Sequence, residues 1–288
     1  MTTPINRRAG HRPEWLKIRI PGDLDRLPVS RLMNDLALNT VCQEARCPNI
    51  FECWSAGTAT FMILGEICTR RCTFCAVGKG KPLAADDDEP RRVAEAVERM
   101  GAKHVVITMV NRDDMADGGA AHVAKTVLAV RERTGAAVEV LISDLEGNRD
   151  ALDVVLASKP EVLAHNVETV PRLYPAVRPV AKYHRSLDVL RWAHEAGAMT
   201  KSSLMLGLGE SDDEILATAR DLRDAGVDIF TMGQYLAPTG NHHPVRRYWT
   251  PEEFASLGER ARALGFHHVE SAPLVRSSYM AHRALEPR

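Results

Sequence analysis

Short apolar runs alternate with segments of helical periodicity from Thr60 almost to the C-terminus. The runs that read as strands begin at Phe61, His104, Val138, Glu161, Ser203, Asp228 and His267. Between them, apolar residues recur at helical spacing, as at Val93, Ala96, Val97 and Met100, which share one helical face. Such alternation predicts parallel βαβ units.

Several helices can be placed within this pattern. Ser211 with Glu214, and Thr250 with Glu253, each fit a capping box, in which two helix-start residues satisfy each other's backbone amides. Further helices are predicted over 119–133 and 184–197. About six βα units follow Thr60, fewer than the eight that close a barrel.

The sequence therefore predicts an α/β fold, a partial (βα)6-type TIM barrel with extensions at both ends. We expect the barrel over residues 60–270. Residues 1–59 form a cysteine-bearing N-terminal extension, and residues 271–288 form a C-terminal segment.

Composition excludes several classes of protein. Hydrophobic residues make up 45% of the chain and charged residues 26%, which argues against a disordered chain. The 37 Lys and Arg nearly balance the 38 Asp and Glu, and aromatics are only 5%, so neither charge nor base stacking favours nucleic acid. No apolar stretch approaches the roughly 20 residues that span a bilayer, and the first residues lack a signal peptide's apolar core. We expect a cytoplasmic protein.

All six cysteines lie between Cys42 and Cys75. Core cysteines have no reason to gather in this way, and a disulfide framework is typical of small secreted chains. Cysteines crowded together in a reducing compartment are better explained as ligands of a metal or a cluster.

Cys68, Cys72 and Cys75 form a CxxxCxxC motif directly after the first predicted strand. Three thiolates can hold three irons of a [4Fe–4S] cluster and leave the fourth iron open to a small molecule, whereas ordinary electron-transfer clusters have four cysteines. Zinc is the alternative. It is disfavoured because closed zinc sites take a fourth Cys or His, and no matching second pair is present.

This motif resembles the signature of radical S-adenosylmethionine enzymes. The preceding triad, Cys42-x4-Cys47-x5-Cys53, makes the chain similar to the lipoyl synthase family in particular. Other segments that resemble this family are Arg112-Asp113-Asp114, Ala164-His165-Asn166-Val167-Glu168 and Arg276-Ser277-Ser278-Tyr279. The resemblance covers about residues 13–282, nearly the whole chain.

The resemblance implies two [4Fe–4S] clusters and S-adenosylmethionine as cofactors. The open-iron cluster is held by Cys68, Cys72 and Cys75, and the second cluster is held by Cys42, Cys47, Cys53 and a serine near the C-terminus. Ser278 is the expected ligand and Ser277 the alternative, although such serines are otherwise found in turns and helix caps. A serine oxygen binds iron less well than a thiolate, which favours release when the cluster is consumed as a sulfur donor.

Contacts to S-adenosylmethionine are expected from polar or bare-backbone positions near strand ends: Thr108, Asn166, Glu168, Lys201, Gly207 and Gly209. Each of these residues is equally compatible with a structural role, and the two glycines also fit a turn before the Ser211 cap. His242, His243, His267 and His268 are interpreted as surface or loop histidines, since adjacent histidines do not readily share one ion.

The reaction that the resemblance implies is sulfur insertion at C6 and C8 of an octanoyl chain. These carbons have no acidic proton, so the hydrogen must be abstracted by a carbon radical that the cofactor supplies. The expected partners are octanoylated lipoyl carrier domains or the H-type protein of glycine cleavage, a flavodoxin- or ferredoxin-like electron donor, and a cluster-repair carrier. The rival hypotheses are a two-cluster electron carrier without catalysis and, more remotely, a zinc-stabilised binding module.

Overall fold

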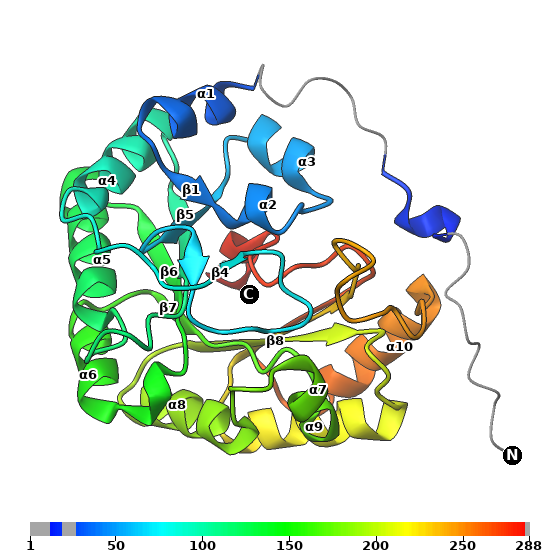
Figure 1. Ribbon diagram of the computed structural model, residues 1–288. Helices are drawn as coiled ribbons and strands as arrows, with labels where there is room; N and C mark the ends of the chain where they lie inside the picture. Colours follow the sequence, from blue (N-terminus) through cyan, green and yellow to red (C-terminus); the bar gives the residue numbers. More distant parts are fainter. Residues whose placement is uncertain (1–11, 19–26, 286–288) are drawn as a thin grey trace, which may run out of the picture.

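The computed structural model describes residues 12–18 and 27–285, and its centre is one curved sheet surrounded by helices (Figure 1). The strand order is β1-β2-β5-β6-β7-β8-β9-β10. Seven consecutive strands of this sheet are parallel: β2 (Thr60–Ile63), β5 (His104–Met109), β6 (Ala137–Leu141), β7 (Val162–Ala164), β8 (Thr200–Leu206), β9 (Ile229–Gln234) and β10 (His268–Ser271). Among the described residues the sheet remains open between β1 and β10, so the predicted α/β partial barrel is confirmed.

Six helices cover the outer face of the sheet: α4 (Glu89–Met100), α5 (Ala120–Thr134), α6 (Arg149–Ala157), α8 (Tyr183–Glu195), α9 (Asp212–Asp224) and α10 (Pro251–Arg262). Both predicted capping boxes are present, at Ser211 and at Thr250. Outward-facing strand residues such as Val138 and Leu204 are buried among helix side chains. This burial supplies most of the apolar area removed from water.

The N-terminal extension joins the same sheet. After η1 (Glu14–Leu16) and α1 (Pro28–Asp35), strand β1 (Asn39–Thr40) pairs antiparallel with β2, placing Thr40 opposite Phe61. Two short helices follow, α2 (Val41–Glu44) and α3 (Ile50–Ser55). The strand pairing therefore brings the segment that begins with α2 beside the start of β2.

The C-terminal segment lies inside the ring of strands in Figure 1. Beside β9, a Cβ added to Gly233 would lie 2.0 Å from the Val275 carbonyl oxygen, so only glycine permits this close approach. Beyond it, Ser278 contacts Thr60 at the start of β2, and η5 (Ala281–Leu285) packs Ala284 against the first residues of β7 and β9. The segment therefore bridges strands near the two open edges of the sheet.

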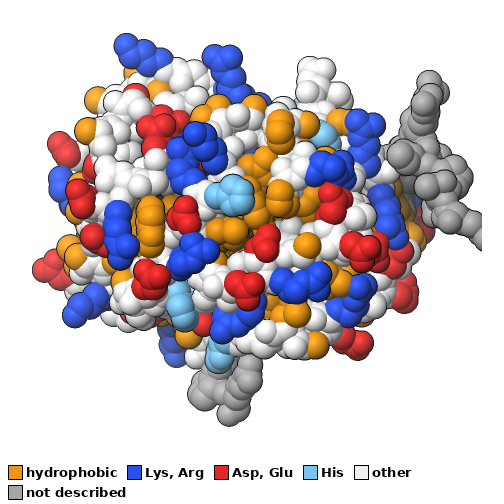
Figure 2. Space-filling model, turned by 90° about the horizontal axis from the view of Figure 1, so that it is seen from below, with side chains coloured by type: hydrophobic (Ala, Val, Ile, Leu, Met, Phe, Trp, Pro, Cys, Tyr) orange, Lys and Arg blue, Asp and Glu red, His pale blue; other side chains and the backbone are white. Residues whose placement is uncertain are grey.

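The outer surface carries both signs of charge. Figure 2 shows Lys and Arg side chains interspersed with Asp and Glu on the face that includes α8 and α9. In the part of the chain that the structure describes, no helix has the length and apolar character needed to cross a membrane.

Candidate metal centres

The CxxxCxxC loop lies at the carboxyl end of β2, where parallel barrels place their active sites. It begins with β3 (Ile67–Cys68), which pairs with β4 (Gly78–Lys79). The Thr73 amide donates to the Val177 carbonyl at 3.0 Å, and the His243 amide donates to the Thr73 carbonyl at 2.9 Å. Loops that follow β7 and β9 thus hold the cysteine loop from two sides.

The histidines of the loop after β9 have a role that the sequence did not indicate. A ring nitrogen of His242 lies 3.2 Å from the Cys75 carbonyl oxygen, and one of His243 lies 3.0 Å from the Leu208 carbonyl oxygen. Both side chains are half-buried. Both are loop residues, as expected, but His242 contacts the backbone of the cysteine loop, while the His243 ring contacts the backbone of the loop after β8.

Cys68 lies close enough to both Cys72 and Cys75 to influence the ionisation of those two thiols. Burial raises the pKa of Cys75 to about 12, and repulsion from the Cys72 and Cys68 thiolates acts in the same direction. Burial also raises the pKa of Cys72, while the nearby Arg178 guanidinium opposes this effect. The three thiols predicted from the motif are therefore grouped in space.

Polar side chains from the segment after β7 lie beside this group. Arg178 is 7% exposed and donates through Nη1 to the Asn166 and Val167 carbonyls, at 2.9 and 3.1 Å. Glu168 accepts from Asn166 Nδ2 at 3.1 Å, and burial raises its pKa while Arg178 lowers it. Arg178 Nε and Asn166 Oδ1 are buried and have no partner among the described residues. No sequence motif points to Arg178.

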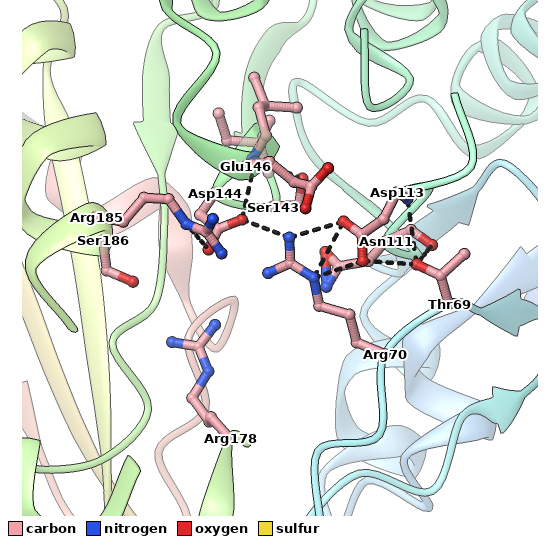
Figure 3. Close-up of polar contacts among 12 residues, drawn as sticks. Thr69, Arg70, Asn111, Asp113, Ser143, Asp144, Glu146, Arg178, Arg185 and Ser186 are labelled. Atoms are coloured by element: carbon pink, nitrogen blue, oxygen red, sulfur yellow. Dashed lines mark hydrogen bonds and ion pairs between the residues drawn. The ribbon is translucent and has the colours of Figure 1, made fainter. Parts of the chain in front are cut away.

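A second polar group holds the segment between Cys68 and Cys72. Figure 3 shows the Arg70 side chain between Asp113, from the loop after β5, and Asp144, from the loop after β6. Arg70 is 2% exposed, so its charge is buried and not solvated. The next residue, Arg71, is exposed.

The N-terminal triad is built around α2 and α3. Cys42 is buried within α2, Cys53 is half-buried within α3, and Cys47 lies between the two helices. Burial raises the pKa of Cys53 to about 12, with Cys47 and Cys42 acting in the same direction. These thiols also form one group.

The C-terminal segment meets this triad at Thr60. The Thr60 hydroxyl donates to Ser278 Oγ at 2.9 Å, and hydrogen bonds from Thr60 also act on the Cys42 thiol, whose pKa burial raises. Arg276 lies near enough to Cys47 to oppose the effect of burial on its pKa. The structure thus brings Ser278 into the neighbourhood of the first triad, far as the two are in sequence.

The other predicted cofactor contacts have protein partners. Thr108 Oγ1 donates to the Leu141 carbonyl at 3.1 Å, and Lys201 Nζ lies 2.8 and 2.9 Å from the two Glu139 carboxylate oxygens. The amides of Gly207 and Gly209 donate to the Glu210 carboxylate. Their polar groups are therefore directed at the protein itself.

The donor sets fit iron–sulfur clusters. All six thiols are free, and iron–sulfur clusters are held by cysteine thiolates. The indole N–H of Trp54 is buried without a hydrogen bond of ordinary geometry, although it lies close enough to the Cys42 thiol to oppose the effect of burial on its pKa, so a sulfur of a cluster bound there would supply an acceptor. Within residues 12–18 and 27–285, no group of three or more His, Cys, Asp or Glu side chains is placed so that it could hold a single metal ion.

Comparison with known proteins first defines a class. Residues 62–222, more than half of the chain, match the sequence model of the Radical SAM superfamily. Streptococcus suis SuiB bound to S-adenosylmethionine shares the fold, with a TM-score of 0.58, 13% identity, and coverage of 85% of this chain and 60% of that chain. Methylornithine synthase gives a TM-score of 0.51, 14% identity, and coverage of 88% and 84%.

Closer relatives narrow the class. A lipoyl synthase of Rubrobacter xylanophilus is 57% identical over 98% of this chain and 90% of its own length. Lipoyl synthases of Symbiobacterium thermophilum and Caldanaerobacter subterraneus are 55% and 53% identical, over 96% and 94% of this chain and 88% and 95% of their own lengths. The chain belongs to the lipoyl synthase family, which confirms the resemblance read from its motifs.

Proposed function

We propose that this protein inserts two sulfur atoms, at C6 and C8, into an octanoyl chain carried on a lysine of a protein substrate. The observation that carries the proposal is the presence of two separate thiol triads on different parts of the fold. One follows β2 at the barrel mouth, and the other precedes β2 in the N-terminal extension. A carrier of electrons alone needs no open-sided triad at a barrel mouth.

In this proposal Cys68, Cys72 and Cys75 hold a [4Fe–4S] cluster with one open iron, and Cys42, Cys47, Cys53 and Ser278 hold a second. The Thr60 hydrogen bond to Ser278 Oγ, next to Cys42, supports Ser278 over Ser277. When bound, the first cluster and S-adenosylmethionine supply a carbon radical, and the second cluster supplies sulfur.

The chain's own contribution at the mouth is to bind and orient. The unpartnered Oδ1 of Asn166 and Nε of Arg178, with the Glu168 carboxylate beside them, offer both donors and acceptors to the polar groups of S-adenosylmethionine. Thr108, Lys201, Gly207 and Gly209 are the weaker members of the proposed set. A bound molecule would have to share or replace the protein partners of their polar groups.

The family implies an octanoylated carrier protein as substrate. We further propose a flavodoxin- or ferredoxin-like electron donor and a carrier that rebuilds the consumed cluster. We also propose a cytoplasmic location, because six free thiols that bind iron require a reducing compartment.

Anaerobic turnover with an octanoyl-lysine peptide, followed by mass spectrometry, tests the function. The expected result is a product with two added sulfur atoms, together with 5′-deoxyadenosine and about eight irons per chain before turnover. Iron without 5′-deoxyadenosine would indicate an electron carrier, and zinc without sulfide would indicate a structural metal site.

Paired serine variants test the fourth ligand. We expect Ser278→Ala to form 5′-deoxyadenosine but little or no lipoyl product, while Ser277→Ala retains lipoyl formation. The reverse pattern would assign the ligand to Ser277, and normal lipoyl formation by both variants would remove serine from the proposal.

A further inference from the structure

The two residues that follow Cys68 are fixed to the barrel wall by side-chain bonds. Thr69 Oγ1 donates to the Asn111 carbonyl and to Asp113 Oδ2, both at 3.0 Å. Arg70 donates to Asp113 through Nε at 2.8 Å and through Nη2 at 2.7 Å, and Nη2 also donates to Asp144 at 2.6 Å. The loop is thus joined to the carboxyl ends of β5 and β6 at once.

The network extends to α8, one of the helices on the outer face of the sheet. Arg185 of α8 donates through Nε to the second Asp144 oxygen at 2.8 Å, and Figure 3 shows it reaching Asp144 from the side opposite Arg70. Asp144 is fully buried and Arg70 nearly so. The positive charges of Arg70 and Arg185 therefore balance the negative charges of Asp113 and Asp144, and buried charges are tolerated when they are paired in this way.

The fixed side chain determines where the Arg70 backbone lies. The Arg70 amide nitrogen is 3.4 Å from Cys68 Sγ and donates to it. The guanidinium points into the wall while the N–H faces the sulfur, so movement of the side chain would carry this donor away from Cys68.

We propose that Arg70 is a positioning residue for the radical-generating centre. Its ion pairs with Asp113 and Asp144 hold the Cys68–Cys72 segment in the shape that binds the cluster and keep the Arg70 N–H on the Cys68 sulfur. The inference rests on the proposed assignment of Cys68, Cys72 and Cys75 as cluster ligands.

Two physical consequences follow. Hydrogen bonds to cluster sulfurs help to set the reduction potential, and a donor N–H stabilises the more negative, reduced state. Losing the geometry of Arg70 therefore makes this cluster harder to reduce. Lysine cannot replace arginine, because an ammonium lacks the planar fork that reaches both carboxylates.

The test uses the full-length protein with both clusters reconstituted, as wild type, Arg70→Lys, Arg70→Gln and Asp113→Asn. Arg131→Lys is the matched control. Arg131 also binds backbone carbonyls and a carboxylate, those of Ser158, Lys159 and Glu161, but it lies at the amino ends of the strands. Redox titration with electron paramagnetic resonance, with and without S-adenosylmethionine, separates the cluster that responds to the cofactor from the one that does not.

We expect both Arg70 variants to retain their iron. Their cofactor-responsive signal should titrate at a more negative potential, and 5′-deoxyadenosine formation should fall about 10- to 100-fold, the usual effect of losing a residue that orients a ligand. The unresponsive cluster should keep its potential, Asp113→Asn should shift the responsive one in the same direction, and Arg131→Lys should match wild type.

An unchanged responsive potential in Arg70→Lys and Asp113→Asn would overturn the inference, as would equal shifts in both clusters. If Arg70→Gln does not retain the responsive cluster, the two milder variants decide. A wild-type protein with no cofactor-responsive signal would instead contradict the proposed function, so the two failures are distinguishable.

Discussion

Lys201 and Glu139 form an ion pair inside the barrel, and replacing Lys201 with Met tests what holds that interior together. Both side chains are almost fully buried, at 2% and 1% exposure, and Lys201 Nζ meets both carboxylate oxygens. Removing one partner leaves a buried charge uncompensated, which typically costs about 3–5 kcal/mol. We expect Lys201→Met to lower the free energy of unfolding by this amount.

A double variant separates the pair from other effects of the substitution. Lys201→Met with Glu139→Leu removes both charges and keeps apolar volume, so most of the lost stability should return. Anaerobic urea unfolding followed by circular dichroism measures the single and the double variant against wild type. A double variant no more stable than Lys201→Met would show that the ion pair is not the source of the loss.

The pH dependence of Lys201→Met is a second readout of the same change. Burial raises the pKa of Glu139 and Lys201 opposes this, so without Lys201 the folded-state pKa rises further above the unfolded value of about 4.3. A carboxyl whose pKa is higher in the folded state than in the unfolded state favours folding most when the pH is below the unfolded pKa. This contribution to the free energy of unfolding is lost as the pH rises through the folded-state pKa. The deficit relative to wild type should therefore grow as the pH rises above the unfolded pKa of about 4.3. A deficit under about 1 kcal/mol, with a raised KM for S-adenosylmethionine, would instead make Lys201 a cofactor contact.

Three further outcomes are expected. Burial lowers the pKa of His165 to about 4, so the stability it contributes is complete above about pH 6.5 and is lost as pH falls toward 4; a urea series should show this slope in wild type and less of it in His165→Gln. Ser211→Ala should lower the free energy of unfolding by about 1 kcal/mol through loss of the α9 cap, and an unchanged urea midpoint would contradict that role. Trp54→Phe removes the indole N–H beside Cys42, so it should alter the electron paramagnetic resonance signal of the cluster that does not respond to S-adenosylmethionine. Lipoyl formation should slow, and 5′-deoxyadenosine formation should stay unchanged. An unaltered signal would place the indole outside that cluster's surroundings.

Much of the barrel could be predicted because its signals are local. Strand runs, helical periodicity and the caps at Ser211 and Thr250 act within a few residues, and the structure has each of them. The nine-residue helix α6 and the antiparallel strand β1 were not predicted. The two residues of β1 are too few to show a period, and they take their conformation from pairing with β2.

The site could be predicted only where a motif carried it. Cysteine spacing pointed to both triads, but Arg70 looks like any loop arginine until the fold brings Asp113 and Asp144 to it, from positions 43 and 74 residues away. Arg178 likewise carries no motif, since its partners are the Asn166 and Val167 carbonyls and the Tyr174 hydroxyl. The sequence places Lys201 among the expected contacts of S-adenosylmethionine, but its partner in the structure is Glu139, which no local pattern connects to it.

Measuring 5′-deoxyadenosine and lipoyl product together in Cys72→Ala and Cys47→Ala shows whether the two triads do different work. Cys72→Ala should form no 5′-deoxyadenosine while retaining about four irons. Cys47→Ala should still form 5′-deoxyadenosine but give no sulfur-containing product. Equal loss of 5′-deoxyadenosine formation in the two variants would show that the two triads do not have separate roles.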